Sequence, residues 1–338
     1  MDTTPARLLK LIDAFAGRRV VIVGDLIADE FIYGRVSRVS REAPVLILTY
    51  DTTEILPGGA GNAARNVASL GGQARAIGIA GRDEPGGRML QSLSRTVDAR
   101  HVLRPIGYRT PTKTRILAGG IHSAKQQVVR IDRASNQSAA TARQSIESRA
   151  LAATRGADAL LVSDYGSGLV TPGLVARLRR SIASGRPVLV DSRYALERYR
   201  GMTACTPNES EVEQLLGVRI GDDTRTLERA GREMLDRTNA HAVLVTRGSR
   251  GMALFERNRS TAHIGIFGSD EIADVTGAGD TVIATMTLAL AAGASFYEAA
   301  RLANYAGGLV VMKRGTATVS ARELRQAVRA DSRDGRSR

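Results

Sequence analysis

Short runs of apolar, mostly β-branched residues recur along the chain and alternate with stretches of helical period. The first run, residues 19–24, follows an amphipathic stretch at 5–15 that suits a short helix. Later stretches such as 173–183 and 209–216 also have helical period. Strands that alternate with helices predict an α/β fold with a doubly wound, mainly parallel sheet. Its other core strands are expected at 74–80, 159–163, 187–190 and 242–246.

Two segments, about 30–56 and 112–132, depart from this alternation. They contain short alternating strands with no helix between them, expected at 31–33, 45–49, 113–117 and 127–131. Together these strands predict a small separate β-sheet. Both segments lie next to candidate site loops in the sequence, so a lid over the site is its natural use.

Local signals place helix ends in the second half of the chain. Ser295 and Glu298 form a capping box for a helix that runs to about Lys313, and Gly315 fits its left-handed end. Residues 1–328 are expected to form one domain with its lid. No apolar residue follows Ala330, so residues 329–338 are predicted to be a disordered basic tail.

The formal net charge of the 338 residues is +14, which suggests a polyanionic partner such as nucleic acid. However, the charge is mostly arginine, spread along the whole chain without a basic block or interleaved aromatic residues. A solvated, arginine-rich surface is therefore the better interpretation, and no nucleic-acid partner is expected.

Cysteine, histidine and hydropathy patterns exclude several classes of protein. Cys205 is the single cysteine, so it forms no internal disulfide and is expected to be a small buried apolar residue near the site. The four histidines are scattered, which excludes a structural zinc site. No charge-free apolar run reaches the ~18 residues of a membrane span, and no signal-type core follows the first ten residues. The expected compartment is the cytoplasm, with no membrane partner.

The most informative stretch is Asp-Val-Thr-Gly-Ala-Gly-Asp at 274–280, which precedes an uncharged helical run at 281–292. An anion site would form at this helix N-terminus from three backbone amides, those of Gly277, Ala278 and Gly279. Asp280 would place a carboxylate at the mouth of that site. This is electrostatically awkward unless Asp280 exchanges a proton beside a phosphoryl group. A helix-capping aspartate is the alternative that spacing alone leaves open.

A second glycine-rich turn, residues 57–62, leads into a helical stretch at 63–70. Gly59-x-Gly61-x-x-Ala64 is a loose dinucleotide fingerprint, but that signature belongs directly after the first core strand. The alternative is that this backbone and Asn62 approach a polyhydroxyl ligand. None of the four lysines follows a glycine, so a Walker A loop is absent, as are protein-kinase and nucleophile-elbow signatures.

Both glycine-rich stretches resemble the signatures of the ribokinase-type (PfkB) family of sugar kinases, and the resemblance covers about residues 19–328. The first signature matches 58–64 with Gly71 and Gly81 at the family spacing. The second matches 274–280, although Thr285 stands where a small residue is usual. The resemblance implies a ribokinase-like fold with a β-sheet lid and an enzyme that transfers phosphate from ATP, with Mg²⁺, to a sugar or sugar phosphate.

Within this family the sequence is most similar to kinases of D-glycero-D-manno-heptose 7-phosphate. Ser167 and Arg193 stand where that branch usually has lysines, and Arg41 replaces a proline. The branch implies phosphorylation of the anomeric hydroxyl. A kinase for another sugar, sugar phosphate or nucleoside is the first alternative, and a catalytically silent or nucleic-acid-binding relative is the second. The similar segments are 24–29, 38–45, 126–132, 163–165, 198–201, 206–211 and 315–320.

The resemblance also implies residue roles. Asp280 would be the general base, and the amides of 277–279 would stabilise charge on the transferred phosphoryl group. Glu211 would lie at a hydrated Mg²⁺ and Asn208 near the phosphates. The nucleotide would also contact Thr246, Gly248 and Asn304. Sugar hydroxyls would be bound by Asp29, Gly58, Gly59 and Asn62.

Three arginines and one loop are further candidates for contact with the substrates. Arg115 and Arg130 are candidates to bind a sugar phosphate, with a solvated strand face as the alternative. Arg247 adjoins the nucleotide strand and could replace the positive charge missing at Ser167. Residues 38–45 are expected to close over the acceptor.

Assembly is the last expectation from the sequence. A two-fold homodimer is expected to pair through the lid at 31–49 and 113–131, because a small sheet has edges and an apolar face to cover. Bifunctional relatives carry a nucleotidyltransferase domain after the kinase. The few residues after Val328 cannot hold one, so nucleotide activation is expected on a separate chain.

Overall fold

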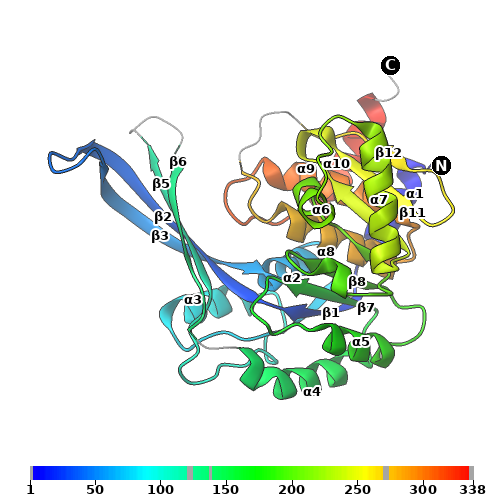
Figure 1. Ribbon diagram of the computed structural model, residues 1–338, viewed down its shortest axis with the longest axis horizontal. Coiled ribbons are helices and arrows are strands. Elements are labelled where there is room, and N and C mark those ends of the chain that lie inside the picture. Colours follow the sequence, from blue (N-terminus) through cyan, green and yellow to red (C-terminus); the bar gives the residue numbers. More distant parts are fainter. Residues whose placement is uncertain (1–2, 120–124, 137–138, 269–273, 335–338) are drawn as a thin grey trace.

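The computed structural model (Figure 1) describes residues 3–119, 125–136, 139–268 and 274–334, and its centre is an eight-stranded sheet. The strand order is β12-β11-β10-β9-β8-β7-β1-β4, and the pairs are parallel except β10–β11 and β11–β12. The doubly wound, mainly parallel sheet is therefore confirmed. Its strands are β1 (Arg19–Gly24), β4 (Gln73–Ile77), β7 (Ala159–Asp164), β8 (Val188–Ser192), β9 (Ala204–Cys205), β10 (Ala242–Thr246), β11 (Met252–Glu256) and β12 (Ala262–Ile264).

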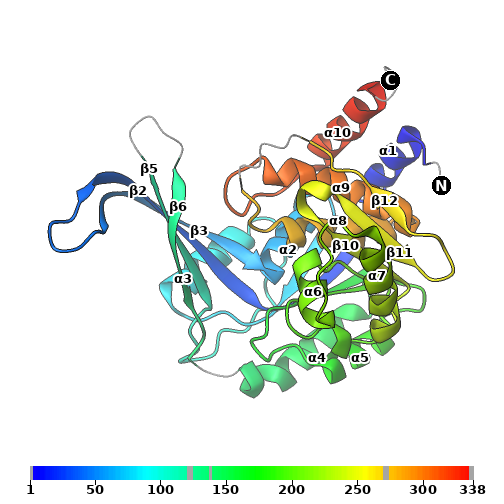
Figure 2. The same cartoon turned by 45° about the horizontal axis from the view of Figure 1, so that its top comes forward.

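Helices cover both faces of this sheet, because its strands are apolar on both sides (Figures 1 and 2). In β1, Val20 and Ile22 face one core while Val21 and Val23 face the other. The first core also receives residues of α1 (Pro5–Asp13), α2 (Ala60–Ser69), α3 (Glu84–Leu93), α8 (Ala278–Ala291), α9 (Phe296–Val311) and α10 (Ala321–Asp334). The second receives residues of α4 (Arg143–Thr154), α5 (Pro172–Ser181), α6 (Glu209–Leu216) and α7 (Thr224–Thr238).

Local signals in the sequence correctly predict the start of α9 but not its end: the helix stops at Val311, its C-cap Met312 is right-handed, and Gly315, which has φ +68°, lies three residues beyond that cap. The side chain of Ser295 accepts a hydrogen bond from the Glu298 amide, and Glu298 accepts one from the Ser295 amide, so the capping box is confirmed. Three short 3₁₀ helices, η1 (Ala139–Ala142), η2 (Leu196–Arg198) and η3 (Gly248–Arg250), complete the described elements. None of the described helices combines the length and apolar character needed to cross a lipid bilayer.

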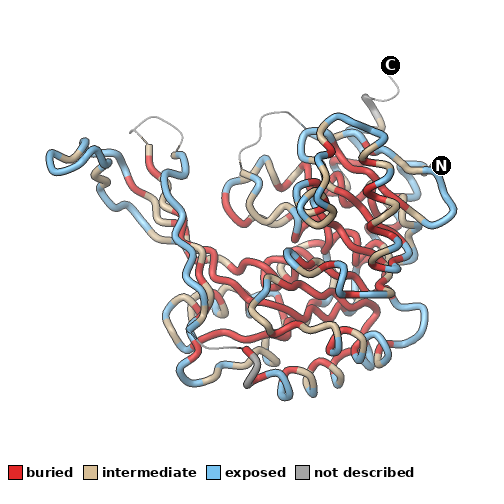
Figure 3. The backbone as a smooth tube through the Cα atoms, in the orientation of Figure 1, coloured by how far each residue is buried: buried red, intermediate tan, exposed pale blue. Residues whose placement is uncertain are grey.

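A second sheet of four strands forms the lid and extends from the body (Figures 1 and 2). Its order is β3-β2-β5-β6, from β2 (Leu26–Val39), β3 (Leu46–Gly59), β5 (Thr112–Gly119) and β6 (Gln126–Arg133). The strands β2 and β3 are longer than predicted, because their pairing continues into the body from Val39↔Leu46 down to Leu26↔Gly59. Figure 3 shows that the base of this hairpin is buried and its outer part exposed.

Residues 38–45 lie at the outer end of the hairpin, away from the body (Figure 1). Asp29 and Val39 are ten positions apart on β2, a span of roughly 30 Å at ~3.3 Å per residue. The expectation that residues 38–45 close over the acceptor of their own chain is therefore wrong in this structure.

The C-terminal segment also differs from the expectation. Residues 329–334 continue α10 instead of forming a disordered tail, while 335–338 lie outside the described residues. The helix is held because Leu324 and Val328 are buried in the first core and Asp331 accepts hydrogen bonds from Tyr305 and Arg301.

Candidate active site

The candidate site lies where the order of the parallel strands reverses. β4 flanks β1 on one side and β7 flanks it on the other, and ligands of open α/β sheets bind at the carboxyl ends of the strands at such a point. Here Asp25 follows β1 and accepts hydrogen bonds from the amides of Tyr165 (2.8 Å) and Ser167 (3.2 Å). The buried Asp25 carboxyl thus fixes the loop that follows β7.

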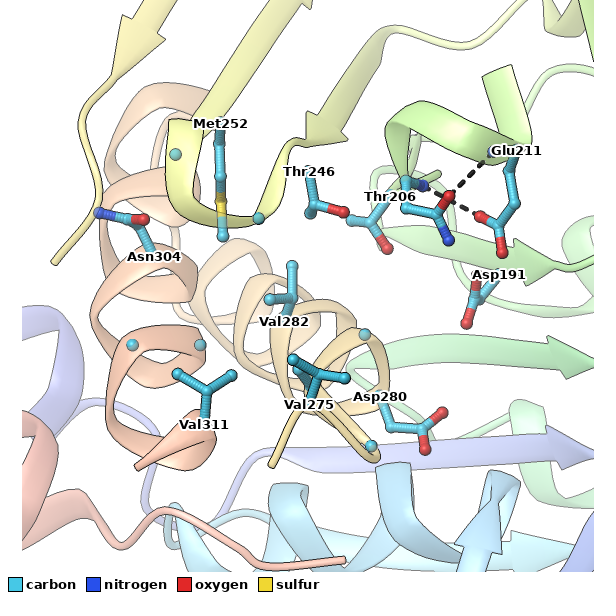
Figure 4. Close-up of a pocket in the computed structure, with 18 of the residues that line it drawn as sticks. Asp191, Thr206, Glu211, Thr246, Met252, Val275, Asp280, Val282, Asn304 and Val311 are labelled. Atoms are coloured by element: carbon cyan, nitrogen blue, oxygen red, sulfur yellow. Dashed lines mark hydrogen bonds between the residues drawn. The ribbon is translucent and has the colours of Figure 1, made fainter. Parts of the chain in front are cut away.

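Asp280 is at the centre of this site, in the first turn of α8. Its side chain is buried but faces a cavity (Figure 4). Asn62 Nδ2 donates to Asp280 Oδ2 at 2.9 Å, and the Tyr165 hydroxyl donates to Oδ1 at 3.1 Å. Burial, with repulsion from Asp29, raises the pKa of Asp280 to about 7, although both hydrogen bonds and the charge of Lys113 oppose the shift. A carboxylate with this pKa can take up a proton near neutral pH.

Two glycines of the signatures allow this close packing. Gly277, the N-cap of α8, has φ +77°, and a Cβ there would lie 2.4 Å from Asn62 Nδ2. A Cβ on Gly58 would lie 2.2 Å from Asp29 Oδ2. Both positions require glycine. A side chain at position 58 would displace the Asp29 carboxyl group, and one at position 277 would displace the Asn62 amide that holds Asp280.

The predicted helix N-terminus is confirmed, but its three amides are not equivalent. The Ala278 amide donates to Val275 O at 3.2 Å, within the turn that begins α8. In the described part of the chain, the amides of Gly277 and Gly279 have no such acceptor. These two amides are therefore available to an anion at the positive end of the helix.

The cavity beside Asp280 has a volume of about 420 Å³ and is polar at one end and apolar at the other (Figure 4). Its polar lining includes Asp191, Asn208 and Glu211, and its apolar lining includes Met252, Val282 and Val311. Nine of the predicted site residues line it: Asn208, Glu211, Thr246, Gly248, Gly277, Ala278, Gly279, Asp280 and Asn304.

Asp191 and Glu211 point toward one another at the polar end (Figure 4). Burial raises the pKa of both, and the pKa of Asp191 is raised further by the charges of Asp280 and Glu211. One Glu211 oxygen caps α6 by accepting from the Asn208 amide at 2.9 Å. Two crowded carboxyl groups are a donor set that Mg²⁺ fits, together with phosphate oxygens and water. The described residues contain no larger cluster of ligating side chains.

Asp29 lies at the base of the lid, close enough to Asp280 for the two carboxyl groups to repel one another. Asp29 Oδ1 pairs with Arg115 NH1 at 2.7 Å, and Oδ2 accepts from the Thr316 hydroxyl at 3.1 Å. A second cavity, of about 590 Å³, opens between the lid and the body, and Asp29 itself lines neither this cavity nor the first. Tyr165 and Arg193 line both cavities, so the two are adjacent.

Three predicted binding residues have other partners. Asn62 is fully buried and donates to Asp280 and to Gly277 O, so it positions the carboxylate rather than reaching a ligand. Arg115 pairs with Asp29, which corrects the proposed sugar-phosphate contact. Arg247 pairs with Glu209 at 2.6 Å and lines neither cavity, so it does not replace a charge at Ser167.

Sequence reasoning also missed four residues of the site. These are Tyr165, which directly follows β7, Asp191, next to the last residue of β8, Lys113, at the start of β5, and Thr316, which follows Gly315; none of them had an assigned role. Position at the carboxyl end of a core strand was the signal available for Tyr165 and Asp191. Gly58 and Gly59 lie where β3 meets α2 and line neither cavity.

Comparison with known proteins identifies the family. The model of the pfkB family of carbohydrate kinases matches residues 18–323. The chain belongs to this family. The enzyme class expected from the sequence, a carbohydrate kinase that uses ATP, is thereby confirmed.

Curated relatives and solved structures agree with this assignment. The bifunctional protein HldE of Trichlorobacter lovleyi is 40% identical over 95% of this chain, and that of Caulobacter vibrioides is 39% identical over 96%. The chain spans 65% of the length of both relatives. A ribokinase from Arabidopsis thaliana complexed with ribose and ATP is similar with a TM-score of 0.72 and 20% identity, over 92% of this chain and 99% of that one. Phosphofructokinase-2 from Escherichia coli has a TM-score of 0.74 and 21% identity, over 94% and 99%.

Proposed function

We propose that this pfkB-family kinase phosphorylates the anomeric hydroxyl of D-glycero-D-manno-heptose 7-phosphate, with ATP as donor. The observation that carries the proposal is Asp280, which lines one cavity and hydrogen-bonds Tyr165 of the adjacent one. The heptose is favoured over other sugars by the similarity to HldE proteins and by the branch motifs in the sequence.

The two sides of Asp280 have complementary roles. Asp280 would take the proton of the acceptor hydroxyl as that oxygen bonds to the γ-phosphorus and the bond to ADP breaks. The amides of Gly277 and Gly279 would stabilise the charge on the transferred group. Asp29, which Arg115 and Thr316 hold in place, would accept hydrogen bonds from acceptor hydroxyls.

The remaining lining of the first cavity suits a nucleotide and its metal. Met252, Val282 and Val311 form an apolar surface for the base, beside Thr246, Gly248 and Asn304. Asn304 donates to Gly265 O at 2.8 Å, which fixes its amide at the cavity wall. Glu211 and Asp191 would hold a Mg²⁺ ion, which neutralises phosphate charge when bound.

The test is ADP release with a panel of acceptors: heptose 7-phosphate, unphosphorylated heptose, fructose phosphates, ribose and a nucleoside. We expect heptose 7-phosphate to give the highest kcat/KM and a product with phosphate on C1 by phosphorus NMR. Robust turnover of another acceptor without turnover of heptose 7-phosphate would reject the substrate and leave the kinase class intact.

Activity should depend on pH through Asp280. Only the deprotonated carboxylate accepts a proton, and its pKa is about 7, so kcat/KM should fall as the pH drops below 7. Tyr165→Phe removes a donor to the carboxylate, which raises its pKa. The acid limb should therefore move to higher pH, with activity recovered in alkaline solution. An unshifted profile for Tyr165→Phe would contradict this.

We also propose a two-fold dimer paired through the lid. The outer lid exposes apolar side chains on three strands, including Val39, Leu46, Tyr50, Val129 and Ile131. Because β3 and β6 are open sheet edges, a second copy would cover both apolar surface and unpaired backbone groups.

Light scattering at micromolar concentration should give twice the mass of one chain. The double substitution Val129→Lys and Ile131→Lys should produce a monomer, because it places charge on the outer lid. Ile106→Lys is the control, since Ile106 is an exposed apolar residue outside the lid. A monomeric wild-type protein would count against lid pairing.

A further inference from the structure

The second cavity, between the lid and the body, is lined by more cations than anions. It has a volume of about 590 Å³, in the usual range for small-molecule sites. Its walls come from β5, β6, and the loops that follow β7 and β8. The charged residues among its lining are Asp25, Lys113, Arg130, Asp132, Arg133 and Arg193.

Internal pairing accounts for most of these charges. Arg130 pairs with Asp132 at 2.9 Å, and Arg133 pairs with Glu30 at 2.7 Å. Asp25 is buried and accepts hydrogen bonds from the backbone and hydroxyl of the loop after β7, and burial raises its pKa. None of these side chains requires an external partner.

Lys113 and Arg193 are different. Within the described residues, neither cation has a carboxylate oxygen within 4.0 Å. Lys113 Nζ lies instead 5.0 Å from the centroid of the Tyr165 ring, and the Arg193 guanidinium lies 5.9 Å from the centroid of Tyr194. Both belong to the cavity wall beside the loop whose Tyr165 contacts Asp280.

The two cations also destabilise one another. Lys113 is half-buried, and burial together with the charge of Arg193 lowers its pKa, although the charges of Asp29 and Asp132 oppose that shift. The charge of Arg193 in turn opposes the rise in the pKa of Asp191 and Glu211, so it interacts with those carboxyl groups without pairing with them. Position 167, where the heptose branch usually has a lysine, holds a serine whose hydroxyl is bonded to Asp25. A bound anion with two charges would relieve the repulsion and replace the missing partners.

We propose that Lys113 and Arg193 bind the phosphate that the acceptor already carries. The inference rests on the proposed function, because it takes the acceptor to be a sugar phosphate. It adds which residues select a phosphorylated acceptor over an unphosphorylated one. Arg193 also lines the nucleotide cavity, so the γ-phosphate of ATP is a second source of the same chemistry. The phosphate on the acceptor is favoured because Lys113 lines the second cavity and not the first.

The first experiment compares heptose 7-phosphate with unphosphorylated heptose in Lys113→Met and Arg193→Met. Each variant should lose about tenfold or more of the wild-type preference for the phosphorylated acceptor, mainly through KM, because it removes a hydrogen bond between a charged side chain and the phosphate. The KM for ATP should stay unchanged. Lys10→Met is the matched control, since Lys10 is an exposed lysine on α1.

Two outcomes would overturn the assignment. An equal fall in kcat for both acceptors would assign the cations to the transferred phosphoryl group, provided that it is measured well above pH 7, where Asp280 is deprotonated even without the Lys113 charge. An unchanged preference would show that they bind neither phosphate.

A second experiment does not depend on the identity of the sugar. With saturating ADP filling the nucleotide cavity, inorganic phosphate should raise the melting temperature of the wild type and not that of Lys113→Met. Without phosphate, Lys113→Met should melt at the same or a higher temperature, since it removes a half-buried, unpaired charge. An equal response of both proteins to phosphate, or none in the wild type, would contradict the proposed site even if the acceptor panel succeeds.

Discussion

Asp280→Asn is expected to lower kcat by at least ~10², the lower end of what a general base contributes. The asparagine has nearly the same shape and can still accept a hydrogen bond from Asn62 or Tyr165, but it cannot take a proton from the acceptor. ATP binding should persist, because the Gly277 and Gly279 amides and the apolar lining are unchanged. Single-turnover phosphoryl transfer and ATP titration calorimetry measure the two effects separately.

The stability of Asp280→Asn separates a base from a structural aspartate. The N-cap of α8 is Gly277, so no cap is lost. Burial raises the pKa of Asp280 from 3.8 to about 7, so the carboxyl lowers folding stability increasingly as the pH rises through that interval. The variant should therefore melt at the same or a higher temperature above pH 7.

Asp223→Asn, at the exposed N-cap of α7, is the matched control and should keep wild-type kcat. Near-wild-type turnover by Asp280→Asn would reject the assignment of Asp280 as the base.

Arg115→Ala is expected to destabilise the protein by about 3–5 kcal/mol, the usual cost of leaving one partner of a buried ion pair alone. The side chains of Arg115 and Asp29 are only 9% and 8% exposed and are joined at 2.7 Å. The guanidinium also lies 5.3 Å from the centroid of the Phe31 ring, so packing is lost as well as charge. Urea unfolding at pH 7 measures the change in free energy.

The neighbouring strand provides a control for Arg115→Ala. Arg130 is the cross-strand register partner of Arg115, but its pair with Asp132 is exposed, with side chains 46% and 49% accessible. Arg130→Ala should change the free energy of unfolding by less than ~1 kcal/mol. Adding Asp29→Asn to Arg115→Ala should recover part of the loss, because no buried charge then remains unpaired. If both arginine variants lowered the free energy of unfolding by similar amounts, the buried pair would not be more important for stability than the exposed pair, contrary to this prediction.

Much of the architecture follows from local sequence. β1, β10 and α6 have the bounds that apolar runs and helical period predict, because the strands are buried on both faces and the helix carries its own capping box. The start of α9 follows from the side chain of Ser295, which accepts a hydrogen bond from the nearby Glu298 amide. These features depend on residues a few positions apart, and the sequence displays them directly.

Residues 329–334 and 38–45 show where local composition was insufficient to predict the structure. Residues 329–334 are polar, but α10 continues because Asp331 reaches Tyr305 on another helix. Residues 38–45 are close to Asp29 in sequence, but the strand between them is extended and carries them away from the site. In both cases the outcome depends on a partner or a direction that neighbouring residues do not encode.

The sequence by itself determined the fold class, the helix that presents Asp280, and the glycines that surround the site, since these depend on periodicity, capping and backbone freedom. Only the tertiary structure decided which side chains meet. Asn62 and Asp280 are 218 positions apart and Arg115 and Asp29 are 86 apart, so their pairing required the folded backbone. The same holds for Arg247, which Glu209 neutralises, and for Lys113 and Arg193, which have no carboxylate partner among the described residues. Whether a charge is paired, buried or available to a ligand depends on distances across the fold, and these set its energy.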